Sequence, residues 1–233
     1  MNHRPQKDVG WTSVSVTPFA KKTQKLRHLL RPVTAALAEK SMDIEELSKK
    51  LYEDLNGRIT AVDFTDNLII YFQCDDWKDY KKIKKFKITC NSVSESEIHP
   101  SPSGTVLFSS NHQLLWNYNE PHGYLYYTSE PENRYDILGR IWEAHEKTFG
   151  DWRPLTDYAN TYNAGQFIEF CDGSNGLLAQ GPKPLIELYQ QAIVDKIQTN
   201  YVPSYNPEGD AKALVFDNCF VICISVAVEV LSS

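Results

Sequence analysis

The spacing of apolar residues along the chain predicts four helices. They are expected at residues 23–40, 43–55, 133–149 and 184–199. Because Pro32 falls inside the first, we expect that helix to kink or to divide in two. Asp43 and Asn133 are typical N-cap residues, whereas Asn56 and Gly150 are typical of the position just after a helix. The second and third helices are therefore predicted with both ends defined.

Between these helices, alternating apolar and polar residues bounded by Asn, Pro and Gly predict short strands. They are expected at residues 12–17, 83–93, 105–109, 114–118, 124–129 and 166–171, with a hairpin over 58–74 that turns at 65–67. Residues 173–181 are predicted to form a glycine-rich loop, and residues 201–210 a polar linker.

The last segment, Lys212–Leu231, is unusually apolar. Alternation places one set of its side chains on a common face: Phe220, Ile222, Ile224, Val226 and Val228. A strand of this composition is expected to lie centrally in a sheet, covered on at least one side.

Many hairpins without a strand–helix–strand rhythm favour an α+β fold, a mainly antiparallel sheet with about four helices packed on it. We expect residues 1–10 to form a flexible tail and 11–233 a single domain. Residues 61–68 resemble residues 213–220, which suggests a weak helix–hairpin duplication between segments 43–74 and 184–230. Common hairpin residues also account for that match.

The composition is that of a globular protein: the chain has 233 residues, of which 42% are hydrophobic and 23% charged. It has five cysteines, widely spaced and without a Cys-x-x-Cys motif, and no apolar stretch typical of an export signal. These features predict reduced, structural thiols in a cytosolic protein. No apolar run approaches the length of a membrane span, so no membrane segment is expected.

Charge is distributed unevenly along the chain. Residues 1–99 carry a net charge of +3 and residues 100–233 a net charge of −9, which together give −6. An acidic chain makes nucleic-acid binding an unfavoured function. Six lysines between Lys78 and Lys87 keep that function open, although an exposed turn and edge strand that resists pairing is the favoured explanation.

Aromatic residues are abundant, with 13 Tyr, 10 Phe and 5 Trp. Several fall on the strands expected at 114–118 and 124–129, where packing within a sheet is the ordinary explanation. Tyr and Trp are also the usual anchors of protein interfaces. The candidate partner-binding residues are Trp116, Tyr118, Tyr124, Tyr126 and Trp152, with the acidic residues Asp151 and Asp157.

A second set of residues would suit small-molecule chemistry. The loop expected at 173–181 precedes a helix, where backbone amides can hold an anion, and its candidate residues are Gly173, Gly176 and Gly181. His122 or Asp172 would then serve as the acid or base. Pro182 removes an amide that a phosphate-binding loop would need, which favours a structural loop. The histidines show no metal-ligand spacing, so neither a metal nor a cofactor is expected.

Two functions remain open from the sequence. The favoured one is a soluble, cytosolic, non-enzymatic protein-interaction module of the inhibitor, immunity or adaptor type, which binds a basic partner through an acidic, Tyr/Trp-rich surface. The alternative is a small-molecule enzyme or ligand-binding protein with a pocket near residues 173–181.

Overall fold

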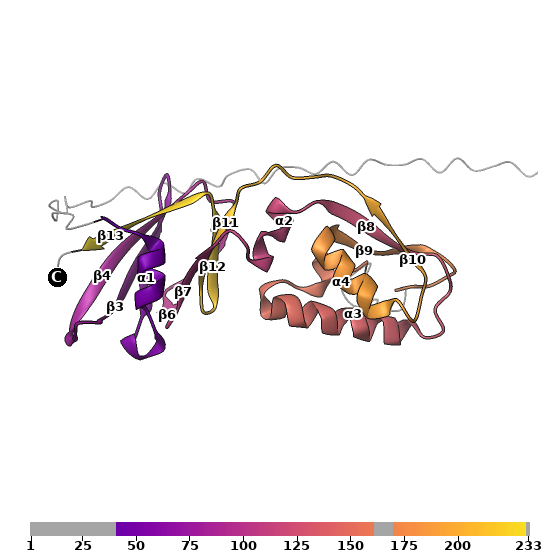
Figure 1. The fold of residues 1–233 in the computed structure, drawn as a ribbon, viewed down its shortest axis with the longest axis horizontal. Helices are drawn as coiled ribbons and strands as arrows, with labels where there is room; N and C mark the ends of the chain where they lie inside the picture. The colour runs from indigo at the N-terminus through magenta and orange to yellow at the C-terminus, as the bar shows by residue number, and fades with distance from the viewer. Residues whose placement is uncertain (1–40, 161–169, 232–233) are drawn as a thin grey trace, which may run out of the picture. The chain divides into compact units, whose positions relative to one another are not determined.

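The computed structural model describes residues 41–160 and 170–231. Their fold is α+β with antiparallel strand pairing, as predicted, and the strands form three sheets (Figure 1). The tail expected at 1–10, the strand at 12–17, the helix at 23–40 and most of the strand at 166–171 lie outside the described residues.

Sheet A has six strands in the order β1-β13-β4-β3-β2-β6. Their bounds are Ser41–Met42 (β1), Arg58–Phe64 (β2), Leu68–Asp76 (β3), Asp79–Asn91 (β4), Ser101–Pro102 (β6) and Ser225–Leu231 (β13). The predicted hairpin is β2 and β3, and its turn is closed by a hydrogen bond from the Thr65 amide to the Asn67 carbonyl.

Sheet B has the order β5-β12-β11-β7, and sheet C has the order β10-β8-β9. The strands of sheet B are Glu95–Glu97 (β5), Val106–Ser109 (β7), Lys212–Phe216 (β11) and Cys219–Cys223 (β12). Those of sheet C are His122–Tyr127 (β8), Gly176–Pro182 (β9) and Thr199–Pro203 (β10).

Four α-helices lie among the described residues: Ile44–Lys50 (α1), Trp116–Asn119 (α2), Arg134–Phe149 (α3) and Lys183–Ile193 (α4). Short 3₁₀ turns occur at Glu53–Leu55 (η1), Gln113–Leu115 (η2), Gly150–Trp152 (η3) and Leu155–Asp157 (η4). The caps of α3 confirm its predicted ends. Asn133 Oδ1 accepts hydrogen bonds from two amides of the first turn, and Gly150 adopts a positive φ of 50°.

Helix α1 begins at its predicted cap, since Asp43 accepts a hydrogen bond from the Glu45 amide. It ends at Lys50 rather than at Leu55, and the chain continues into η1 before Asn56 turns left-handed with a φ of 48°. The predicted apolar stripe is nevertheless buried, including Leu51 and Leu55. The core therefore receives the expected side chains from a shorter helix.

Strand β12 lies centrally in sheet B and is buried at all five positions. Cys219, Val221 and Cys223 join a core between sheet A, sheet B and α1, whereas Phe220 and Ile222 join a second core beneath η2. The prediction of a covered central strand is confirmed. Each face of β12 needs its own cover, which makes sheet B an internal layer.

The single face expected over residues 220–228 is wrong. The chain leaves sheet B at Cys223 and enters sheet A at Ser225, with Ile224 exposed at the crossing. This change of sheet reverses the alternation, so Val228 packs into the same core as Cys223 and not into that of Phe220.

A third core lies between sheet C and the helices α3 and α4, which run side by side (Figure 1). Leu125 and Tyr127 of β8 point into it, together with Ile141 of α3 and Tyr189 of α4. By alternation, Tyr124 and Tyr126 lie on the opposite, outer face of the sheet.

Three other expectations are corrected. Residues 114–118 form η2 and the start of α2 rather than a strand, because Leu114 and Leu115 are both buried, which alternation cannot provide. Residues 176–181 belong to strand β9 rather than to a loop. Helix α4 ends at Ile193, and Thr199–Pro203 pairs with β8 instead of extending the helix or forming a linker.

The glycines of β9 explain the second error. The Tyr127 ring lies 2.9 Å from where a Cβ on Gly176 would stand, and the Tyr158 ring lies 2.8 Å from the same position on Gly181. Gly181 also has a φ of 148°. These glycines therefore allow aromatic rings to approach the strand closely rather than making the backbone flexible.

A partly buried ion pair joins sheet B to the segment after α3. Arg153 donates two hydrogen bonds to Glu95 of β5, at 2.5 and 2.6 Å, and the Tyr118 hydroxyl donates a third at 2.6 Å. Burial by itself raises the pKa of Glu95, but the hydrogen bonds from Arg153 and Tyr118 outweigh it, and the pKa is lowered. The carboxylate is therefore held in its charged form.

We predict that Glu95→Gln lowers the free energy of unfolding by about 2 kcal/mol, because it leaves the Arg153 guanidinium without a counter-charge. This is less than for a fully buried pair, since the Glu95 side chain is 30% exposed. Urea denaturation measures the effect. Glu97→Gln, an exposed position on the same strand, is the control, and equal stability of the two variants would contradict the prediction.

Candidate functional site

A cavity of about 280 Å³ opens at one end of sheet C. Five segments line it, and the residues used below are Asn117 of α2, His122 and Tyr124 of β8, Asp157 and Tyr158, Gln180 and Gly181 of β9, and Ser204 and Tyr205. We call it the sheet C cavity. No lysine or arginine is among its lining residues.

Aromatic rings form much of the wall. The His122 and Tyr205 rings stack with their centroids 4.5 Å apart and their planes at 22°. Tyr158 is held by stacking on Phe149 of α3, with an interplanar angle of 2°. Tyr124 completes the wall and lies 6.3 Å from the Tyr126 ring along the same strand. The cavity is thus lined by several aromatic residues whose rings pack on one another or on the core.

The hydrogen bond of His122 defines its tautomer. Its Nε2 lies 3.2 Å from the Asn117 carbonyl oxygen, which can only accept, so Nε2 carries the proton. Burial lowers the pKa of His122, although the bond to the carbonyl opposes this effect. The ring is therefore neutral at pH 7, and its Nδ1 offers a lone pair.

The remaining polar groups of the lining are one carboxylate, two side-chain amides, and the hydroxyls of Ser204 and the tyrosines. The Asn117 side-chain amide donates to the Tyr158 hydroxyl at 2.8 Å, which leaves the Asn117 Oδ1 as an acceptor. Asp157 is exposed and makes no ion pair with any described residue. Gln180 contributes a second amide. The lining has a net charge of −1 when His122 is neutral.

The predicted partner-binding residues separate into two groups. Tyr124, Tyr126 and Asp157 lie on the outer face of sheet C or in its cavity, and Asp151 is exposed in η3. The other three are half-buried and engaged in packing: Trp116 against Phe149, Trp152 against Phe220, and Tyr118 with Glu95. Their role in binding stays a prediction.

The residues of the alternative site are divided between two places. His122 and Gly181 line the sheet C cavity, whereas Asp172 and Gly173 line a separate cavity of about 380 Å³. There Asp172 is 3.7 Å from Arg134. Gly176 lies against Tyr127 and lines neither of these two cavities.

Sequence reasoning missed Asn117, Gln180 and Tyr205 as members of the site. Tyr205 lies in the segment expected to be a linker, and only the pairing of β10 with β8 brings it onto His122. The two tyrosines of that segment, Tyr201 and Tyr205, were the available signal.

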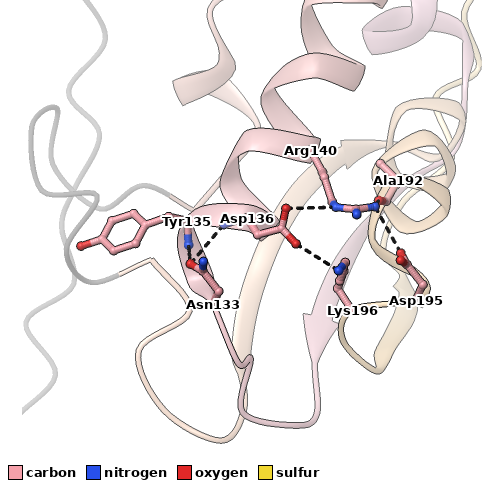
Figure 2. A network of polar contacts seen from close by, with 7 residues as sticks. All are labelled: Asn133, Tyr135, Asp136, Arg140, Ala192, Asp195 and Lys196. Atoms are coloured by element: carbon pink, nitrogen blue, oxygen red, sulfur yellow. Dashed lines mark hydrogen bonds and ion pairs between the residues drawn. The ribbon is translucent and has the colours of Figure 1, made fainter.

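A polar network between α3 and α4 is structural (Figure 2). Arg140 donates to Asp136 at 3.2 Å, to the Ala192 carbonyl at 3.2 Å and to Asp195 at 3.3 Å. Lys196 lies 3.4 Å from the second oxygen of Asp136. These cations neutralise the carbonyl end of α4 and tie it to the first turns of α3.

The lysine-rich segment lies on the β3–β4 hairpin. Lys84 stands over the Trp77 ring at 3.6 Å and pairs with Asp76, while Lys82 pairs with Asp79. All five cysteines are buried and unpaired. Within residues 41–160 and 170–231, no three His, Cys, Asp or Glu side chains are grouped to hold a metal, and no helix has the length and apolarity to span a membrane.

Comparisons with protein-family models, curated proteins and solved structures find no match to this chain.

We predict that stability depends on pH through His112 and His122, because burial lowers the pKa of each. The folded state binds protons less readily than the unfolded state, so the free energy of unfolding falls as pH drops below about 6.5. The double variant His112→Asn/His122→Asn should show a flatter decline in urea denaturation between about pH 7 and about pH 5.5. His99→Asn, at an exposed histidine, is the control, and a double variant with the wild-type slope would refute the assignment.

Proposed function

We propose that this chain is a non-enzymatic protein-interaction module that binds a basic partner through the outer face of sheet C. The observation that carries the proposal is a set of aromatic and aliphatic side chains on that face. They are Tyr124, Tyr126, Leu177, Val202 and Tyr205, here called the tyrosine face.

Register places these side chains together. Tyr124 is paired with Val202 on one side, and Tyr126 is paired with Leu177 on the other, so all four point away from the α3–α4 core. Tyr126, Val202 and Tyr205 are 37%, 38% and 56% exposed. None of the five belongs to the three buried clusters of the described residues. Exposed tyrosines of this kind are typical anchors of protein interfaces.

Charge supports a basic partner. Residues 100–233, which supply every residue of sheet C, carry a net charge of −9. Asp157 adjoins the tyrosine face at the cavity and has no ion-pair partner among the described residues. Complementary charge would speed association and exclude acidic competitors. Because all five thiols are unpaired, we place this function in the reducing cytosol.

One observation favours a second candidate, a small-molecule enzyme or ligand-binding protein. The sheet C cavity joins His122, a group suited to proton transfer, with Asp157 and Gly181. A thermal-shift screen with nucleotides, sugars and metal ions tests this candidate. Stabilisation by one ligand class, abolished by His122→Asn, would place it ahead of the interaction module.

The interaction proposal is tested by quantitative capture of partners from the native lysate. We expect the wild type to capture a basic protein in a stoichiometric amount. Tyr126→Ala/Val202→Ala should bind that protein at least about tenfold more weakly. Neither substituted residue lines the cavity, so the test isolates the face itself.

The matched control is Tyr135→Ala/Val194→Ala, which removes a Tyr that is 60% exposed and a Val that is 72% exposed from the helical side of the same core. It should capture the partner like the wild type. The proposal fails if no stoichiometric partner is found, or if both double variants retain it equally.

A further inference from the structure

We propose that the sheet C cavity receives the guanidinium group of an arginine side chain from the partner protein. This inference rests on the proposed function and specifies the chemistry of its anchor. It follows from which hydrogen-bonding groups line the cavity, from the orientation of its rings and from its size.

Three residues that line the cavity carry hydrogen-bond acceptors with no hydrogen-bond partner among the described residues. These acceptors are the Asp157 carboxylate, the Nδ1 lone pair of His122 and the Asn117 Oδ1, whose amide nitrogen is already engaged by Tyr158. A guanidinium has five N–H donors and no acceptor, so it can use such a set fully. An anion would instead meet the Asp157 carboxylate with no cationic side chain in the lining.

Aromatic rings also line the cavity, namely the stacked pair His122–Tyr205 and the neighbouring Tyr124. A flat, weakly hydrated guanidinium stacks on the faces of such rings, whereas an ammonium is compact and more strongly hydrated. Arginine is for this reason preferred over lysine.

The volume agrees with a side chain as occupant. Cavities for drug-sized ligands and cofactors measure about 300–1,000 Å³, so about 280 Å³ suits a smaller group. The cavity adjoins the tyrosine face through Tyr124 and Tyr205, which belong to both. A partner that covers the face would therefore bring one of its side chains to the cavity mouth.

Electrostatics in the cavity favour a cation. Asp157 is the one carboxylate in the lining, which holds no lysine or arginine. Arg153, whose charge acts on Tyr158, lies outside the lining and is paired with Glu95. His122 is half-buried, and it is neutral at pH 7 because this partial burial lowers its pKa. A bound guanidinium therefore meets one negative charge and no positive charge from the lining.

The test titrates four small-molecule probes into the full chain and measures their binding by two-dimensional NMR. They are N-acetyl-L-arginine methylamide, the citrulline and lysine equivalents, and free L-arginine. The blocked arginine should shift the signals of His122, Tyr124 and Gly181. The citrulline compound has the same shape without the charge and should bind about tenfold more weakly.

Two matched variants locate the charge. Asp157→Asn should weaken binding of the blocked arginine by about fivefold, whereas Asp63→Asn should leave it unchanged. Asp63 is an exposed carboxylate in β2 that does not line the cavity. Unchanged spectra elsewhere would show that both variants keep the fold.

Several results would overturn the inference. Equal binding of the arginine and citrulline compounds would show that the positive charge does not contribute to binding. Equal binding of the arginine and lysine compounds would show that the cavity does not prefer a guanidinium. Tighter binding of free L-arginine than of the blocked form would make the ligand a free amino acid. If the blocked arginine does not bind but Tyr126→Ala/Val202→Ala still loses the partner protein, the proposed arginine anchor is wrong and the interaction function stands. If Tyr126→Ala/Val202→Ala keeps the partner protein, the interaction function itself is wrong.

Discussion

The burial of strand β12 on both faces is the constraint around which the described fold is arranged. A strand whose five residues are all buried cannot lie at a surface, so sheet B needs one cover from sheet A and α1 and another from η2 and Trp152. The second cover fixes α2, and α2 supplies Asn117 to the sheet C cavity. The apolar C-terminal segment thus acts on the candidate site through packing, without touching it.

A small number of polar contacts connect sheet B to the segments that line the sheet C cavity. Glu95 and Arg153 connect sheet B to the segment that carries Asp157 and Tyr158, and His145 bonds the Arg153 carbonyl at 2.6 Å. Tyr158 in turn lies against Gly181 and bonds Asn117. The last two contacts hold Asn117 and Tyr158 where they line the cavity.

Local signals predicted the elements with strong caps and periodicity, and failed where long-range packing decided the conformation. Asn133 and Gly150 act through their own backbone neighbours, so both ends of α3 were predicted from local signals. Gly176 and Gly181 suggest a loop by composition, yet both lie in strand β9. Glycine stands at these positions because the Tyr127 and Tyr158 rings occupy the space that a Cβ would need. The reversal at Ile224 depends on a change of sheet, which alternation within one strand cannot reveal.

The sequence by itself determined the α+β class, the apolar central strand, the buried thiols and the acidity of the C-terminal part, because each follows from composition or from periods of two and 3.6 residues. Only the tertiary structure decided which aromatic residues reach the surface. It turned Trp116 and Trp152 toward the core and left Tyr126 and Tyr205 outside. The physical reason is that a ring's exposure depends on what packs beside it, and those neighbours come from segments far apart in the chain.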